Sequence, residues 1–460
     1  MVDAAHLGTL NRGAVVAPAG HGKTELLAQV AALGGRSLIL THTNAGVHAI
    51  RERLRRLGVP GARAAVQTIA KWCARYAYAF PGAAQPPLDD PKTAAEWQQL
   101  HLGTASALGI AAIREVVLAS YDRVLVDEYQ DCTPDQHVLV KRLSEIVPTI
   151  VVGDPMQGIF EFAGAKLDWP TEIHPDFPFS GTLTVPYRWA GKNPALGAWI
   201  AETRLKLEHG QPIDLADPRV SYRVSKGPFD MGLLFETLEG KDGSVAAIHC
   251  NKKICYRLAS AANGGYQAIE EVAANTLMSF ARQWDRAADA KERLAAVLSL
   301  SNECFHKIDF DKTQEFDPDH ALARDGMKAA AKRFGDGNGG EAAGRFMALA
   351  RTHPKWKLYR SSLWRDAEHA AAELTAERTE CMVDAAERIK QRSSNMGRRL
   401  PRRTISTPLL LKGLEFDHVV IPDAAHFMKQ DMAQAKLFYV AISRATLSLT
   451  IGSSQRWLQF

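Results

Sequence analysis

The chain has 460 residues, more than one hydrophobic core of ordinary size can serve, so we expect two to four packed units of roughly 100 to 200 residues. Apolar residues make up 46% and charged residues 23%, and no apolar stretch approaches the ~20 residues that cross a bilayer. This excludes a membrane partner and favours a folded soluble protein, while the net charge of +5 permits a polyanionic partner without requiring one.

Compartment and redox state follow from the first residues and the cysteines. The opening stretch MVDAAHLGTLNRG lacks the basic start and apolar core of a secretion signal, so we expect a cytoplasmic location. The six cysteines form no CxxC pair, which favours isolated reduced thiols over a zinc site or a disulfide framework.

The first part of the chain alternates apolar strand patterns with helical patterns. Strands are predicted at GAVVA, SLILT, RVLVDE and TIVVGD, and helices at 23–33, 45–57 and 134–146. This rhythm is typical of a parallel sheet covered by helices. At about 79–118 the composition shifts to alanine, proline and glutamine, which indicates a small insertion.

A second αβ rhythm follows GTLTVPYRW, with a helix predicted at 193–205 and a strand at 244–250. Residues 269–389 are helical in composition, apart from the glycine-rich FGDGNGGEAAG and Pro354. Strands return at RTIST, HVVIP and LSLTIG, with a helix at 432–442. The pattern predicts an α/β fold whose second sheet is split by a long helical insertion.

A phosphate-binding loop is indicated by VVAPAGHGKTE, which runs from a strand through a glycine-containing loop into a helix. Gly20 and Gly22 let backbone N–H groups close around phosphate oxygens, Lys23 neutralises the phosphates and the Thr24 hydroxyl ligates Mg²⁺. The spacing departs from the common pattern only at its first glycine, where Ala17 stands. A fortuitous GKT at a strand-to-helix turn is the alternative.

Two carboxylates follow the predicted strand in RVLVDEYQD. Ligand sites of open α/β sheets lie at the carboxyl ends of the strands, which is where Asp127 and Glu128 are expected. Asp127 would hold the magnesium, and Glu128 would orient and deprotonate the attacking water. Alone, a strand ending in Asp-Glu is usually a solvated strand end; together with the glycine loop it predicts an ATPase.

The chain resembles superfamily 1 UvrD/Rep-type DNA helicases in the order and spacing of eight stretches: APAGHGKT, LTHTNAGVHAIRERL, VQTIAKWCARYA, VDEYQDCTPDQ, VVGDPMQGIFEFAGA, VPYRWA, KGLEFDHVVI and LFYVAISRA. The resemblance implies two RecA-like parallel-sheet domains, ATP and Mg²⁺ as cofactors, and single-stranded DNA as partner. The first domain would span 1–186, the second 187–268 and 396–460, and the mostly helical insertion 269–395.

The resemblance also places ATP-site roles on individual residues. Gln157 would sense the γ-phosphate and the attacking water, Arg188 and Arg444 would close over the γ-phosphate, Tyr187 would stack on the base and Glu415 would meet the ribose. The implied catalytic residues are Lys23, Glu128, Gln157, Arg188 and Arg444; the nucleotide contacts are Gly20, His21, Gly22, Lys23, Thr24, Glu25, Tyr187, Gly413 and Glu415; the magnesium ligands are Thr24 and Asp127. For Arg444 a surface salt bridge is the alternative.

DNA contacts are implied in the same way, at the loops LTHTN and QTIAKW, at FEFAGA and before KGLE. They are Thr41, Thr43, Asn44, Thr68, Phe162 and Thr407. An aromatic residue stacked on a base contributes roughly 1 to 3 kcal/mol. For Phe162, core packing is the alternative.

The chain departs from the family pattern in four places. No glutamine precedes the glycine loop where the family reads adenine, and Ala163 replaces a common arginine. Leu409 and Leu411 stand where the family carries polar or small residues, and we interpret TPLLL as strand core. Both insertions are short for the family.

The leading hypothesis is therefore an ATP-dependent translocase or helicase acting on DNA. A nucleotide-gated subunit or sensor that regulates a partner such as a nuclease is the alternative, because DNA-facing positions are altered and the insertions are reduced. The chain is also similar in size and architecture to the helicase-like subunit of the Gabija antiphage system, a similarity that suggests a nuclease partner and a role in antiviral defence. A degenerate ATPase used as a scaffold fits poorly, since each ATP-site position carries usable chemistry.

Overall fold

The computed structural model describes residues 2–159, 167–225, 227–269, 273–306, 318–396, 401–428 and 432–460. Packing divides the chain into two compact units: Met1–Ile213, Met428–Leu447 and Gln459–Phe460 form the first, and Asp214–Phe427 with Ser448–Leu458 the second. The predicted domain boundaries follow the two sheets rather than this packing, and they stay a prediction.

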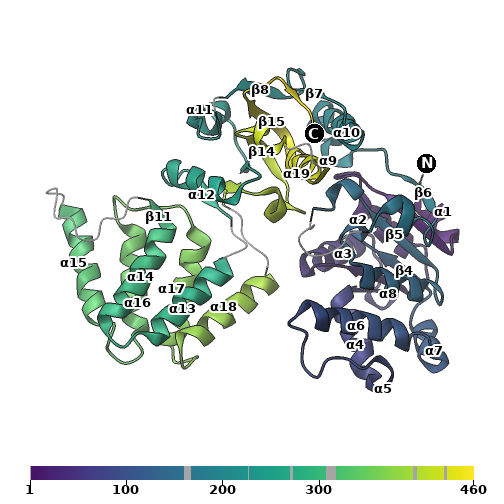
Figure 1. Cartoon of the computed structure of the whole chain (residues 1–460), viewed down its shortest axis with the longest axis horizontal. Coiled ribbons are helices and arrows are strands. Elements are labelled where there is room, and N and C mark those ends of the chain that lie inside the picture. The colour runs from purple at the N-terminus through teal and green to yellow at the C-terminus, as the bar shows by residue number, and fades with distance from the viewer. Residues whose placement is uncertain are drawn as a thin grey trace. The chain divides into compact units, whose positions relative to one another are not determined.

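The first unit is built on a six-stranded sheet in the order β3-β2-β4-β5-β1-β6, paired in parallel (Figure 1). Its strands are β1 (Arg12–Val16), β2 (Ser37–Thr41), β3 (Ala64–Thr68), β4 (Arg123–Val126), β5 (Thr149–Gly153) and β6 (Phe179–Thr182). Because β4, β5 and β1 are neighbours, the segments that follow them lie at one edge of the sheet.

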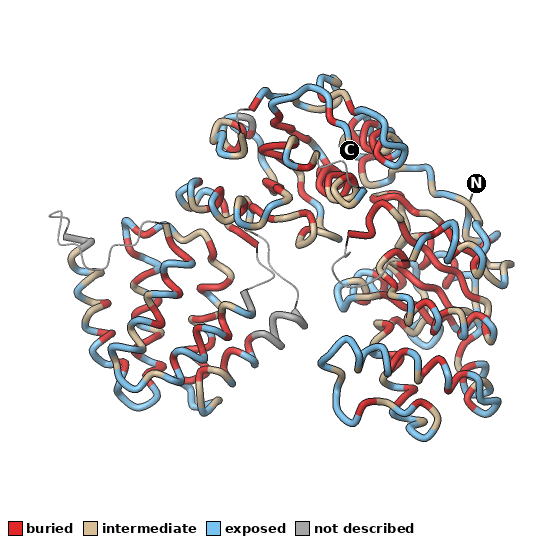
Figure 2. The backbone as a smooth tube through the Cα atoms, in the orientation of Figure 1, coloured by how far each residue is buried: buried red, intermediate tan, exposed pale blue. Residues whose placement is uncertain are grey.

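Helices cover both faces of this sheet because successive strand residues point to opposite sides. Leu38 and Leu40 join a core with α4, α6 and α8, whereas Ile39 between them joins a core with α2 and α3. Figure 2 shows these central strands as buried. The helices are α1 (Ala4–Thr9), α2 (Lys23–Ala32), α3 (Asn44–Arg56), α4 (Ile69–Ala79), α5 (Pro81–Ala84), α6 (Ala94–Ala107), α7 (Ala111–Ser120), α8 (Pro134–Ser144), α9 (Tyr187–Ala190), α10 (Pro194–Glu208) and α19 (Met432–Ile442).

A second six-stranded sheet has the order β10-β13-β9-β14-β15-β8. Its strands are β8 (Ser221–Val224), β9 (Val245–Ile248), β10 (Gln267–Ala268), β13 (Arg403–Ser406), β14 (Phe416–Ile421) and β15 (Ala445–Ser453). Helices α11 (Met231–Phe235) and α12 (Lys252–Ala261) pack on it through a core that includes Leu234, Leu258 and Val420. Two short strands, β7 (Ile213–Asp214) and β16 (Trp457–Leu458), pair separately.

A helical bundle is inserted between β10 and β13 (Figure 1). Its core consists only of its own residues, with Trp284, Phe334 and Trp364 fully buried. The helices are α13 (Ala273–Arg286), α14 (Ala290–Cys304), α15 (Pro318–Lys332), α16 (Gly340–Thr352), α17 (Ser361–Thr375) and α18 (Met382–Met396), with a small hairpin of β11 (Phe305–His306) and β12 (Lys357–Leu358). The predicted fold class, two parallel sheets with a helical insertion in the second, is confirmed.

One local prediction was wrong. Leu409, Leu410 and Leu411 do not continue strand β13, which ends at Ser406; they form a 3₁₀ turn, Pro408–Leu411. Pro408 explains the difference, because proline has no backbone N–H for a strand ladder but fits the start of a helical turn. Only Leu411 of the three leucines is fully buried.

Among the described residues, no single helix has the length and apolar composition needed to cross a membrane. Helices α6 and α7, bent by 93° to each other, pass that test only when they are taken together.

Candidate active site

The loop between β1 and α2 has the backbone geometry of an anion cradle. Gly20 (φ 74°) and Gly22 (φ 85°) lie in the left-handed region, which glycine adopts without strain. Helix α3 begins with a threonine hydroxyl that accepts a backbone N–H, and so does α4, but α2 begins at Gly22 with no side-chain cap. The first N–H groups of α2 therefore have no capping side chain and are suited to an anion.

Lys23, the first residue of α2, lies against the two carboxylates that follow β4. Its Nζ is 3.4 Å from Asp127 Oδ1 and 2.5 Å from Glu128 Oε1. Burial alone would lower the pKa of Lys23, but Asp127 and Glu128 raise it above its usual value. Burial raises the pKa of Asp127 to about 6, against the opposing effect of Lys23. The structure thus brings three predicted site residues together from positions about a hundred residues apart.

Glu128 is held in an unusual conformation. Its backbone lies in the left-handed region (φ 54°), where a residue with a side chain costs of order 1–3 kcal/mol. Its Oε2 accepts a 2.5 Å hydrogen bond from Gln130 Nε2, and Gln130 Oε1 accepts the backbone N–H of Asp154 at 2.9 Å. Gln130 therefore joins Glu128 to the segment that follows β5.

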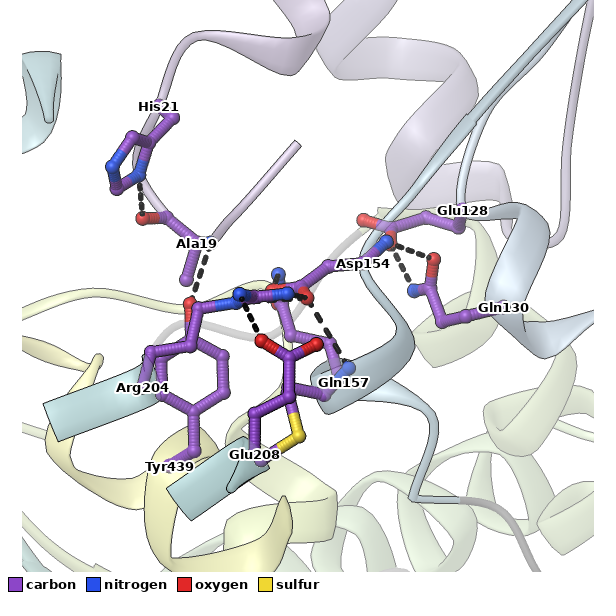
Figure 3. Close-up of polar contacts among 10 residues, drawn as sticks. Ala19, His21, Glu128, Gln130, Asp154, Gln157, Arg204, Glu208 and Tyr439 are labelled. Atoms are coloured by element: carbon purple, nitrogen blue, oxygen red, sulfur yellow. Dashed lines mark hydrogen bonds and ion pairs between the residues drawn. The ribbon is translucent and has the colours of Figure 1, made fainter. Parts of the chain in front are cut away.

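That segment contains a buried polar network (Figure 3). Asp154 is fully buried; its carboxylate accepts Gln157 Nε2 at 3.0 Å and Arg204 Nη2 at 2.9 Å, and Arg204 also donates to Glu208 at 3.0 Å. Burial would lower the pKa of Arg204, but Asp154 raises it above its usual value, so the guanidinium stays charged. The predicted Gln157 is thus positioned by Asp154.

Helix α19 contacts the loop directly. Tyr439 Oη accepts the backbone N–H of Ala19 at 2.9 Å, and burial raises the pKa of Tyr439 well above its usual value, so the hydroxyl stays protonated. His21 is buried and its Nδ1 lies 2.8 Å from Ala19 O. Burial lowers the pKa of His21, which makes the imidazole neutral at pH 7.

The segment that begins α9 lies over the same loop. A Cβ added to Gly22 would come 3.0 Å from the ring of Tyr187, and one added to Gly20 would come 2.8 Å from Arg188 Cβ. Arg188 Nη1 donates to Ser443 O at 2.6 Å. Tyr187 and Arg188 therefore lie beside the candidate phosphate loop, and their roles toward a nucleotide stay a prediction.

Arg444 follows α19 and is only 1% exposed. Its Nε donates to Val440 O at 3.0 Å and its Nη2 to Ser443 Oγ at 2.8 Å. A surface salt bridge, the alternative interpretation, is wrong because the guanidinium is buried. Arg188 and Arg444 both contact Ser443, so the two predicted arginines lie in one cluster.

Three further residues were predicted at the ATP site: Glu25, Gly413 and Glu415. Glu25 forms an ion pair with Arg53 of α3 at 2.9 Å. Gly413 (φ 82°) and Glu415 are exposed in the second compact unit, after the 3₁₀ turn that Thr407 precedes.

The predicted DNA-contact residues of the first unit gather at two neighbouring strand ends. Thr41 and Thr68 are register partners where β2 and β3 end. Thr43 and Thr68 each begin a helix and accept a backbone N–H through the hydroxyl, while Asn44 is exposed beside Thr43. Thr41 is buried. Phe162 and Ala163 lie outside the described residues.

Sequence reasoning missed four residues of this site: Gln130, Trp189, Arg204 and Tyr439. The sequence could have indicated Arg204, because it stands four positions after Ile200 and so lies on the same buried face of α10. An arginine on such a face needs a buried partner. Trp189 packs against Gly20 and donates from Nε1 to Ala445 O at 2.7 Å.

The oxygen donors present fit Mg²⁺, which prefers one or two carboxylates or hydroxyls together with phosphate oxygens. Asp127 and Thr24 offer such donors at the start of α2 and the end of β4. Among the described ranges, no group of three or more histidines, cysteines and acidic residues could hold a metal by itself. The uncapped helix and Lys23, whose side chain is 12% exposed, fit the triphosphate.

Comparisons with known proteins found a family model, a curated relative and a solved structure that resemble parts of this chain. Residues 88–178 match the family model of the UvrD/REP helicase N-terminal domain. The F-box DNA helicase 1 of Gallus gallus is 38% identical over 85 residues, which is 18% of this chain and 8% of that protein. A structure of the arterivirus helicase, nonstructural protein 10, with DNA aligns at 13% identity and a TM-score of 0.28, over 54% of this chain and 49% of that one.

The chain thus spans a small part of that curated relative and about half of that structure. The matched segment 88–178 contains β4, β5, Asp127, Glu128, Asp154 and Gln157. The predicted resemblance to UvrD/Rep-type helicases is therefore confirmed for this segment.

Proposed function

We propose that the protein is a DNA-dependent ATPase that translocates on DNA and unwinds it. One observation carries the proposal: Lys23 begins an uncapped helix and lies within ion-pair distance of both carboxylates that follow β4. This arrangement places a cation, an anion-binding helix start and a pair of carboxylates together at the edge of the sheet where β1 and β4 end. The helicase family match supports DNA as the partner.

In this proposal the chain's residues divide the work of ATP hydrolysis. The N–H groups at Gly20, Gly22 and the start of α2 bind the phosphates, and Lys23 neutralises them. Thr24 and Asp127 hold Mg²⁺, which when bound neutralises charge on the phosphate oxygens. Glu128, fixed by Gln130, accepts the proton of the attacking water.

Two further groups respond to the γ-phosphate. Gln157, held by Asp154, orients the attacking water, and the cluster of Arg188 and Arg444 stabilises charge on the transferred phosphoryl group. Arg444 is held by Val440 O and Ser443 Oγ, and its guanidinium has further N–H groups that can donate to phosphate oxygens. Tyr187, beside Gly22, offers its ring to the base.

The experiment is ATP hydrolysis with and without single-stranded DNA at stated salt, since polyanion binding is salt-dependent. We expect stimulation by DNA and a loss of at least 100-fold in kcat for Lys23→Ala and Glu128→Gln, in line with the 10²–10⁴-fold contribution of a general base. Lys141→Ala is the control, because Lys141 forms a surface ion pair with Asp176 at 2.6 Å. Equal rates with and without DNA would contradict the proposal.

A nucleotide-gated subunit that regulates a nuclease is the second candidate. It is favoured by the turn Pro408–Leu411, where apolar residues occupy family positions for polar ones and Leu411 is fully buried. The two functions differ in one measurement: unwinding of a forked duplex by the protein alone supports the helicase, and ATP hydrolysis without unwinding supports the regulator.

A further inference from the structure

A basic groove lies along the outer edge of the first sheet, outside the candidate active site. Its volume is about 620 Å³, and its floor includes Leu54, Val59 and Val66. Strand β3 ends the sheet order, so among the described strands its outer edge has no neighbour. Four cationic residues line the groove: Arg51, Arg55, Lys71 and Arg75.

The four cations form two facing rows. Arg51 and Arg55 are four residues apart on α3, and Lys71 and Arg75 are four residues apart on α4, so each pair shares one helix face. All four are exposed, and no acidic residue lines the groove. Within the described part of the chain none of them forms an ion pair, in contrast to Arg53 on α3, which pairs with Glu25.

This arrangement costs free energy unless an anion binds. Like charges at i,i+4 destabilise a helix, and the groove has two such pairs. Arg51 is also held at the edge, because its Nη2 donates to Val66 O of β3 at 2.9 Å. Four exposed cations without an acidic neighbour in the groove, one of them held by Val66 O, suit a polyanion.

The groove is continuous with the predicted DNA loops. Gln67 lines it, and the next residue, Thr68, ends β3 beside Thr41. We propose that this groove binds the phosphodiester backbone of the DNA strand after it passes Thr68. The floor offers no base-stacking ring, so the contact is to phosphates and does not depend on sequence.

The proposal rests on the proposed function for the identity of the polyanion, and its test is independent of ATP hydrolysis. The probe is a fluorescein-labelled oligothymidylate, and the measurement is its affinity by fluorescence anisotropy over a salt series. Three variants of the full chain carry the same loss of two charges: Arg51→Gln/Arg55→Gln, Lys71→Gln/Arg75→Gln and the control Lys141→Gln/Arg142→Gln on α8.

Each lost phosphate contact lowers the salt slope of log Kobs by about 0.7 for a single strand. Each groove variant should therefore lower the slope by about 1.4 and weaken binding roughly 10- to 30-fold at 0.1 M salt. The control should keep the slope of the wild type. Lys23→Ala should also keep it while losing ATP hydrolysis, which separates the groove from the active site.

Slopes that stay unchanged in both groove variants would overturn the groove while leaving the ATPase proposal intact. If the groove variants lower the slope but DNA does not stimulate ATP hydrolysis by the wild type, the groove proposal stands and the proposed DNA-dependent ATPase is overturned. Basic side chains beside an edge strand also prevent pairing with other chains. If the variants aggregated and their soluble fraction kept the wild-type slope, that protective role would replace the proposal.

Discussion

At the scale of single residues, Gly22 joins backbone conformation to nucleotide binding. Its left-handed φ of 85° and the 3.0 Å space beneath Tyr187 both exclude a side chain. Gly58 has a similar φ of 67° but open space around the missing Cβ. The two glycines therefore differ in surroundings and not in backbone strain.

We expect Gly22→Ala and Gly58→Ala to lose similar stability, about 1–2 kcal/mol, the cost of the left-handed conformation. Only Gly22→Ala should lose nucleotide affinity, because its Cβ displaces Tyr187. Denaturant unfolding and titration with a fluorescent ATP analogue measure the two effects. Equal nucleotide affinity in both variants would show that the position of Tyr187 over Gly22 does not matter for nucleotide binding.

A second residue-scale feature is a histidine pair in the second unit. His249 Nε2 and His426 Nδ1 lie 2.9 Å apart, and His249 Nδ1 accepts the Asn251 N–H, so the proton between the rings belongs to His249 Nε2. Burial, followed by the field of His426, lowers the pKa of His249 to about 4. Protonation in the folded state is thus disfavoured.

The pH dependence follows from this sign. The unfolded chain binds a proton near the usual pKa of 6.5 and the folded chain only near 4, so stability is full above pH 6.5 and falls as the pH drops toward 4. Between pH 7.5 and 5.0 the loss should be about 2 kcal/mol.

Urea unfolding of the second unit at those two pH values measures this loss. His249→Gln should remove most of it, even if the variant is less stable at pH 7.5, whereas the exposed His48→Gln should unfold like the wild type. If His249→Gln still lost the full amount of about 2 kcal/mol of stability between pH 7.5 and 5.0, groups other than His249 would be responsible.

At the scale of elements, the buried Asp154–Arg204 pair fixes α10 to the segment after β5. Both partners are nearly inaccessible, with side-chain exposures of 0% for Asp154 and 6% for Arg204. Removing one partner leaves an uncompensated buried charge, which typically costs 3–5 kcal/mol, whereas replacing both by uncharged groups is often neutral.

We therefore expect Arg204→Met to destabilise the first unit by about 3–5 kcal/mol and Asp154→Asn/Arg204→Met to recover much of that loss. Denaturant unfolding measures both. Arg142→Met on α8 is the control, because Arg142 pairs with Glu145 at the surface. If the double variant were as unstable as Arg204→Met, the cost would come from lost packing and not from an unpaired charge.

Elements also show why prediction succeeded where it did. The helix predicted at 432–442 is α19, and the strand at SLILT is β2, because periodicity and β-branched runs are local signals. The turn Pro408–Leu411 was missed because an apolar run does not distinguish a strand from a buried turn. Tyr439 was missed because its contact with Ala19 joins residues 420 apart in the chain.

At the scale of the whole molecule, the bundle α13–α18 has a core of its own, separate from both cores of the first sheet. Cores that share no residues can unfold separately. We expect Trp364→Ala in the bundle and Trp72→Ala in the first unit, each costing about 3–5 kcal/mol, to shift different transitions in calorimetry. One transition lowered equally by both variants would show that the chain unfolds as a whole.

The hydrogen bond from Ala19 to Tyr439 sets an order in time. A ribosome adds roughly 5 to 20 residues per second, so the 420 residues between the two take roughly 20 to 80 s to synthesise. During that interval the nascent chain already carries Gly20, Gly22 and Lys23 but lacks the helix that holds their loop. The loop therefore gains the contact that holds Ala19, and Arg188 gains its neighbour Arg444, only after α19 has emerged.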